Sequence, residues 1–187
     1  QQTFNPVNFD PAKWAKAARD AGMRYVVFTS KHHDGFSMFD SKFTDYKITS
    51  PSTPFHTNPK ANAAKAIFDA FRKEGMLVGA YFSKPDWHNE NYWWPNFATP
   101  ARNVNYDPAV YPERWKAFTD FTHNQVMELM SDYGRIDNLW LDGGWVRKRP
   151  KEETERTYAE LIRESKTGFL KARIVDQDIR MDDLVAK

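Results

Sequence analysis

The sequence predicts an α/β fold, as a consecutive part of a (β/α)8 barrel that is incomplete in this chain of 187 residues. Helical and strand periods alternate along the chain, and each predicted helix ends at a glycine that is followed at once by a strand. The connections after strands are long, as they are where α/β proteins build their sites. Three clear strands cannot close a barrel, which is why we expect part of one. A small doubly wound sheet is the alternative.

The first helix is the best marked of the predicted elements. Asp10 stands at its N-cap and Pro11 at its first helical position, and Gly22 ends it. Gly75 and Gly134 end the next two helices in the same way. The predicted elements are, in order, a helix over 11–21, a strand over 23–29, a helix over 62–74, a strand over 76–82, a helix over 111–133 and a strand over 136–141. Further on, the charge-dense residues 147–156 indicate the solvated start of a helix, and residues 178–187 indicate another.

The amino-acid composition excludes several classes of binding partner and several kinds of site. Charged residues make up 28% of the chain, with a formal net charge of +2, so no large basic field would attract nucleic acid or an anionic membrane. The chain has no cysteine, which excludes a disulfide framework, a thiolate nucleophile and a Cys-ligated zinc. No apolar run reaches the roughly 18 residues of a membrane span. Aromatic residues reach 16%, which fits either a large aromatic core or rings that stack on a sugar.

The motif KHHDGF at 31–36 directly follows a predicted strand. Two histidines and an aspartate there could bind a metal, bind the hydroxyls of a polar ligand, or serve the fold alone. On an extended chain, His32 and His33 point to opposite sides, so we expect that one metal cannot take both unless the chain turns. This argument favours hydroxyl binding over metal binding.

The motif WLDGGW at 140–145 marks the end of the third predicted strand. Trp140 and Asp142 share one face of that strand. A carboxylate at such a position is costly to bury without a partner, so Asp142 should be either paired or catalytic. An aromatic ring beside it could pack against a sugar while the carboxylate reaches the anomeric carbon. The alternative is that Asp142 and Gly143 simply form a turn.

A third stretch, over 83–94, begins at the end of the second predicted strand and is rich in aromatic rings. It could line a cleft, or it could be a loop packed on its own side chains.

Taken together, these stretches resemble glycoside hydrolase family 29, the α-L-fucosidases. The similarity includes FDPAKW at 9–14, AGMRYVV at 21–27, KHHDGF at 31–36 and DSKFTDY at 40–46. The segment QDIRM at 177–181 is also similar to one that these enzymes carry after the nucleophile.

This resemblance implies that residues 1–187 form part of a catalytic (β/α)8 domain with a retaining double-displacement mechanism. Asp142 matches the family's nucleophile, and His32 and His33 match histidines that hydrogen-bond the fucose hydroxyls. Trp140 matches a pocket tryptophan, and Tyr81 corresponds to a pocket tyrosine. The implied partner is a fucosylated glycan, no metal or organic cofactor is required, and the implied location is periplasmic or secreted.

The resemblance also implies residues that the chain does not supply. Enzymes of the family carry a general acid/base Glu well after the nucleophile. The last glutamate here, Glu164, lies in a charged segment and is not assigned that role, so we expect the acid/base residue outside this chain. Two other readings remain open: a non-catalytic carbohydrate-binding module, and a metal-dependent hydrolase that uses His32 and His33.

Overall fold

The computed structural model describes residues 1–97, 104–143 and the strand at 173–176. Its helices and strands are, in order, α1 (Pro11–Asp20), β1 (Tyr25–Lys31), α2 (Ala63–Lys73), β2 (Leu77–Ser83), α3 (Pro112–Asp132), β3 (Asn138–Asp142) and β4 (Arg173–Asp176), with short 3-10 turns at Pro54–Thr57 and Pro95–Phe97. All six elements that the sequence predicts are present, and the strands begin and end one or two residues later than expected. The strand β4 was not predicted. The helices expected within 147–156 and 178–187 lie outside the described residues.

The helix boundaries follow from the predicted local signals. The Asp10 side chain accepts a hydrogen bond from the backbone N–H of Lys13 at 3.2 Å, which caps α1. Gly22, Gly75 and Gly134 all have positive φ angles, between 72° and 79°, directly after the three helices. A left-handed residue turns the chain sharply, so each helix leads into the next strand through a short connection.

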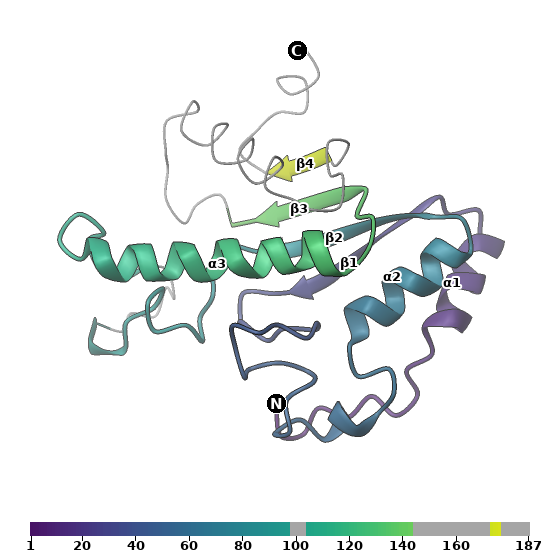
Figure 1. Cartoon of the computed structure of the whole chain (residues 1–187), viewed down its shortest axis with the longest axis horizontal. Helices are drawn as coiled ribbons and strands as arrows, with labels where there is room; N and C mark the ends of the chain where they lie inside the picture. Colours follow the sequence, from purple (N-terminus) through teal and green to yellow (C-terminus); the bar gives the residue numbers. More distant parts are fainter. Residues whose placement is uncertain (98–103, 144–172, 177–187) are drawn as a thin grey trace, which may run out of the picture.

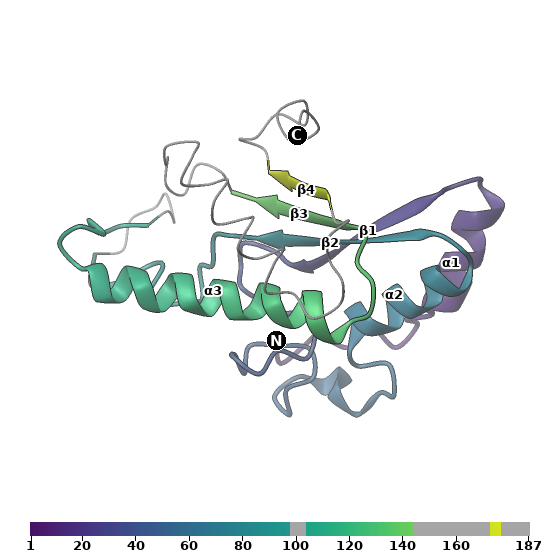
Figure 2. The same cartoon turned by 45° about the horizontal axis from the view of Figure 1, so that its top comes forward.

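The four strands form one parallel sheet in the order β1-β2-β3-β4. The three helices all lie on the same face of this sheet (Figures 1 and 2). Thr29 of β1 is in register with Tyr81 of β2, which is in register with Trp140 of β3. These three residues therefore share the face that the helices leave uncovered. The predicted α/β class with a parallel sheet is confirmed.

The hydrophobic core lies between the sheet and the helices. Val78, Ala80 and Phe82 alternate along β2 and are fully buried toward α2 and α3. On those helices, Phe68 and Leu129 belong to the same buried cluster. This packing fixes the strands, and so it fixes where their carboxyl ends lie. Within the described residues, no helix has the length and apolar character that crossing a membrane requires.

Candidate functional site

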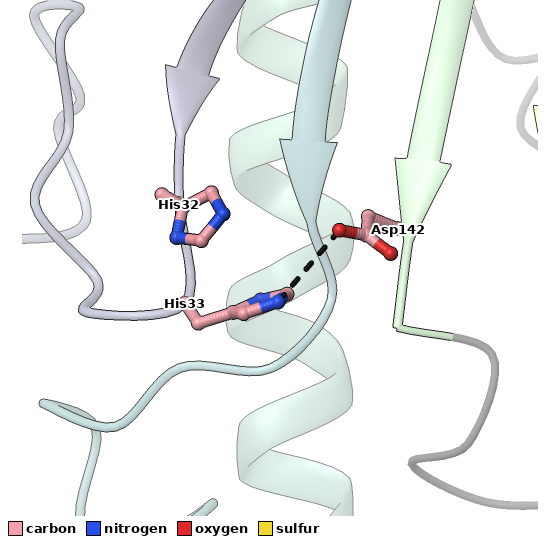
Figure 3. A group of neighbouring side chains, drawn as sticks. All are labelled: His32, His33 and Asp142. Carbon is pink, nitrogen blue, oxygen red and sulfur yellow. Dashed lines mark ion pairs between the residues drawn. The ribbon is translucent and has the colours of Figure 1, made fainter.

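Four of the five residues singled out in the sequence meet at the carboxyl ends of adjacent strands. His32 and His33 follow β1, Tyr81 lies near the end of β2, and Asp142 is the last residue of β3. Figure 3 shows the His33 ring directed toward Asp142 across the end of β2, with His32 beside it. Parallel strands place their carboxyl ends at one edge, which explains why segments far apart in sequence converge here.

Asp142 is mostly buried, with 9% of the residue exposed, and it has hydrogen-bond donors for both carboxylate oxygens. The Tyr81 hydroxyl donates to Oδ2, and the backbone N–H of Gly143 donates to Oδ1 at 2.6 Å. Burial, together with the hydrogen bond to Asp142, raises the pKa of Tyr81, so this hydroxyl keeps its proton and remains a donor. Asp142 is therefore a paired carboxylate at a strand end rather than only a turn residue.

The His33 ring lies between two fixed polar groups. Its Nδ1 contacts the hydroxyl of Ser83, and that hydroxyl donates its single proton to the Pro85 carbonyl at 2.9 Å. The hydroxyl must therefore accept from Nδ1–H, which leaves the lone pair of a neutral imidazole on Nε2. Nε2 lies 3.7 Å from Oδ2 of Asp142. Two acceptors thus face one small region, where either could bind a ligand hydroxyl or both could bind a cation.

The electrostatics of His33 favour this neutral form. Burial lowers its pKa below the ordinary value, and the neighbouring His32 adds to that shift, whereas the Asp142 carboxylate opposes it. A neutral imidazole can accept a hydrogen bond from a sugar hydroxyl, and a protonated one cannot.

His32 corrects one expectation from the sequence. The two adjacent histidines were expected to point to opposite sides, but their ring centroids lie only 4.2 Å apart. The chain turns directly after β1, where the backbone N–H of Gly35 donates to the His32 carbonyl at 3.0 Å. The His32 ring also stacks on Tyr81, with centroids 5.8 Å apart and planes 10° apart. The turn therefore removes the geometric argument against a shared metal.

Within the described part of the chain, His32, His33 and Asp142 form the group that could hold a metal ion. One ligand atom each from His32, His33 and Asp142 lies within 4.8 Å of the others. Imidazole nitrogens and a carboxylate oxygen are a donor set that zinc accepts. The geometry of these three residues fits either the hydroxyls of a polyol or a divalent metal. A chemical test is therefore needed to distinguish these two kinds of ligand.

Some of the aromatic residues singled out in the sequence lie at the site, and others are buried in the protein. Trp140 lies on the same sheet face as Tyr81 and is 37% exposed, which leaves an apolar ring surface next to the site. In the loop after β2, Trp87 packs beside the His33 ring at 5.5 Å, whereas Tyr92 is fully buried against Phe118. This loop is therefore both a packed structure and a wall of the site.

Comparison with known proteins identifies the relatives of this arrangement. A family model described as alpha-L-fucosidase matches residues 1–185. The chain belongs to the α-L-fucosidase family. The resemblance found in the sequence is confirmed.

Individual members of the family show the extent of the similarity. Alpha-L-fucosidase 1 of Arabidopsis thaliana is 29% identical over 140 residues, which are 75% of this chain and 23% of that protein. Among solved structures, alpha-L-fucosidase isoenzyme 1 of Paenibacillus thiaminolyticus is 41% identical, with a TM-score of 0.65 over 86% of this chain and 38% of that one. A family 29 enzyme of Bacteroides thetaiotaomicron, trapped as a covalent intermediate with 2-fluoro-fucosyl fluoride, is 32% identical, with a TM-score of 0.66 over 86% and 34% of the two chains. The chain thus spans about a quarter to two fifths of the length of these relatives.

Two features of this α-L-fucosidase family site were not apparent from the sequence. One is the role of Ser83, which fixes the proton of the His33 ring. The other is a buried ion pair between Lys31 and Asp86, at 3.0 Å. A lysine directly before two histidines at a strand end was the available signal for the pair, but its partner lies 55 residues away.

Proposed function

We propose that the protein carrying this chain is a retaining α-L-fucosidase that hydrolyses terminal α-L-fucosyl linkages of glycans, with Asp142 as its nucleophile. The observation that carries the proposal is the placement of Asp142 at the strand ends, with donors on both carboxylate oxygens and with the His33 acceptor beside Oδ2. These donors fix the orientation of the carboxylate in its mostly buried position. Membership of the family supplies the reaction class.

In this mechanism a carboxylate oxygen of Asp142 attacks the anomeric carbon and forms a covalent fucosyl-enzyme, while the bond to the leaving oxygen breaks. A second carboxyl group, roughly 5–5.5 Å from the first, gives its proton to that leaving oxygen. It then takes a proton from water, which attacks the anomeric carbon and releases Asp142 as the carboxylate. We place this acid/base glutamate outside the chain described here.

The neighbouring residues bind and orient the sugar. The lone pair on Nε2 of His33 accepts a hydrogen bond from a fucose hydroxyl, and His32 serves a second hydroxyl beside it. Trp140 offers its exposed ring to the apolar side of the sugar. Tyr81 holds Asp142 in place through the hydroxyl bond to Oδ2.

We also propose that residues 1–187 are part of a catalytic (β/α)8 barrel domain. Four parallel strands in sequential order, with the helices on one face, support this architecture. The long connections after β1 and β2 lie at the same edge as Asp142, as they do in barrel enzymes.

Replacement of Asp142 tests the nucleophile. In the parent protein, Asp142→Gly should remove most turnover of an aryl α-L-fucoside, because no group is left to form the covalent intermediate. Added azide should restore part of the activity by taking the place of the carboxylate. Asp142→Asn is the matched control, because its amide fills the space, excludes azide and should stay inactive. Turnover close to wild type in either variant would refute the assignment.

A second candidate is a metal-dependent hydrolase, which the convergence of His32, His33 and Asp142 favours. Dialysis of the parent protein against a chelator separates the two candidates. The fucosidase proposal expects unchanged turnover, whereas loss of activity that zinc restores would establish the metal centre. A third outcome, binding of fucose without turnover in the intact wild-type protein, would favour a carbohydrate-binding module.

A further inference from the structure

Lys31 has an unusual position for a lysine. It is the last residue of β1, it directly precedes His32, and it is completely buried. The register between β1 and β2 shifts by one residue here, since Thr29 pairs with Tyr81 and Lys31 pairs with Phe82. This β-bulge turns the Lys31 side chain to the helix-covered face, where its ammonium lies 4.3 Å from the centre of the Phe82 ring.

Polar side chains from two other elements contact this ammonium. Asp86, in the loop after β2, accepts from it at 3.0 Å, and Gln125 of α3 accepts at 3.2 Å. Asp86 is 1% exposed. Burial lowers the pKa of Lys31, and the Asp86 carboxylate opposes that shift. A buried ion pair often stabilises a protein no more than apolar residues of the same size would. Stability alone therefore does not explain why an ion pair is buried next to the site.

The second oxygen of Asp86 organises the loop that borders the histidines. Oδ1 accepts from the backbone N–H groups of His88 and Asn89, at 3.1 and 2.9 Å. The same oxygen lies against Gly35, where an added Cβ would come within 2.3 Å of it. Gly35 has a φ of +84°, so a residue without a side chain suits both the conformation and the contact.

The segment 32–35 is thus fixed at several points by one carboxylate and its loop. Lys31 anchors its start through the ion pair, and Gly35 rests against Asp86 at its end. Between them, the backbone N–H of Trp87 donates to the His33 carbonyl at 2.8 Å.

We infer that the buried pair of Lys31 and Asp86 is a positioning device that sets the orientation of the His33 ring toward Asp142. Neither residue touches the substrate, and both act through His33. The inference rests on the proposed fucosidase function, because it assigns His33 a role in binding the sugar.

A double variant, Lys31→Met with Asp86→Asn, isolates this effect. It removes both charges, leaves no unpaired charge, nearly preserves both volumes and keeps an oxygen to accept from His88 and Asn89. The double variant is made in the parent protein twice, once with His33 intact (the wild-type background) and once together with His33→Ala. The measurements are kcat and KM for an aryl α-L-fucoside and inhibition by α-L-fucose, expressed per folded active site.

In the wild-type background, kcat/KM should fall by up to about 10-fold, because displacing His33 can cost no more than the neutral hydrogen bond that it makes. In the His33→Ala background, the same double variant should change kcat/KM by less than about 2-fold, because the group that it positions is already gone. An equal loss in both backgrounds would overturn the inference, since a purely structural role acts without regard to His33. No loss in the wild-type background would overturn it as well.

Two controls separate positioning from stability. Lys65→Met with Asp69→Asn makes the same chemical change at an exposed ion pair of 2.6 Å and should leave kcat/KM unchanged. Leu129→Ala, in the core, should lower Tm without changing kcat/KM per active site. If the Lys31/Asp86 double variant does not fold, Asp86→Asn alone provides the same comparison with and without His33. A wild-type protein without turnover would reject the proposed function itself, which is a different result from equal losses in an active enzyme.

Discussion

Tyr81→Phe tests how the candidate nucleophile is held. This substitution keeps the ring that stacks on His32 and removes only the hydroxyl that donates to Oδ2 of Asp142. The bond should be strongest when Asp142 carries its full charge and weakest in the covalent intermediate, where the carboxylate has become an ester. Tyr81 therefore should help most in the second step, when Asp142 leaves with its charge restored.

The size of the effect follows from the charge of the acceptor. A hydrogen bond to a charged group contributes about 1.5–3 kcal/mol. At about 1.4 kcal/mol for each factor of ten in rate, complete loss of that contribution slows hydrolysis of the intermediate by about 10- to 150-fold. Formation of the intermediate should be affected less, because Asp142 loses its charge in that step.

The assay follows the two steps separately in the parent protein. With an aryl fucoside that has a good leaving group, Tyr81→Phe should release the aryl group in an initial burst that is faster than its steady-state turnover. When the intermediate is trapped with a 2-fluoro fucoside, Tyr81→Phe should reactivate more slowly than the wild type. Tyr25→Phe is the matched control, because Tyr25 is an exposed tyrosine of β1. Reactivation within 2-fold of wild type in Tyr81→Phe would refute the argument.

Three further predictions concern the segment 32–35. His32→Ala and His33→Ala should each lower kcat/KM by about 2- to 10-fold if each imidazole forms a hydrogen bond of about 0.5–1.5 kcal/mol with a sugar hydroxyl, and full activity in both would reject that role. Gly35→Ala should lower the free energy of unfolding by more than Gly22→Ala, because both have positive φ but only Gly35 meets Asp86, and equal losses of Tm would contradict the contact. The pKa of His33 is lowered by folding, so its contribution to stability is present above about pH 6.5 and is lost as the pH falls toward the lowered value. Wild type should therefore lose more Tm than His33→Gln between about pH 7.5 and 5, and parallel curves would count against the shift.

The helices, strands and their order could be predicted because their signals are local. Each of the helices has a run of apolar residues at helical spacing, a capping or proline start and a glycine stop, and these depend on a few neighbouring residues. Asp142 and the two histidines could be placed together for a related reason. They follow parallel strands, and such strands end at one edge.

The contacts that orient the site could not be predicted, because they depend on pairs distant in sequence. The turn that brings His32 and His33 together depends on how the segment 32–35 packs against Asp86. The shift of register after Thr29 depends on β2, not on β1 alone. A strict alternation along β1 would have placed Lys31 on the same face as Tyr81, which is the opposite of its position in the structure.

That reversal of Lys31 has a chemical consequence for Asp142. On the face with Tyr81, a lysine ammonium would lie among the groups that surround the carboxylate, and a cation there would pair with Asp142 and weaken it as a nucleophile. The bulge moves the ammonium to the other side of the strand ends, where the Asp86 carboxylate neutralises it. Among the described residues, the hydrogen-bond donors to Asp142 are the neutral Tyr81 hydroxyl and the Gly143 backbone N–H, with a neutral His33 beside them. The arrangement holds the carboxylate in place while leaving its charge available for attack on the sugar.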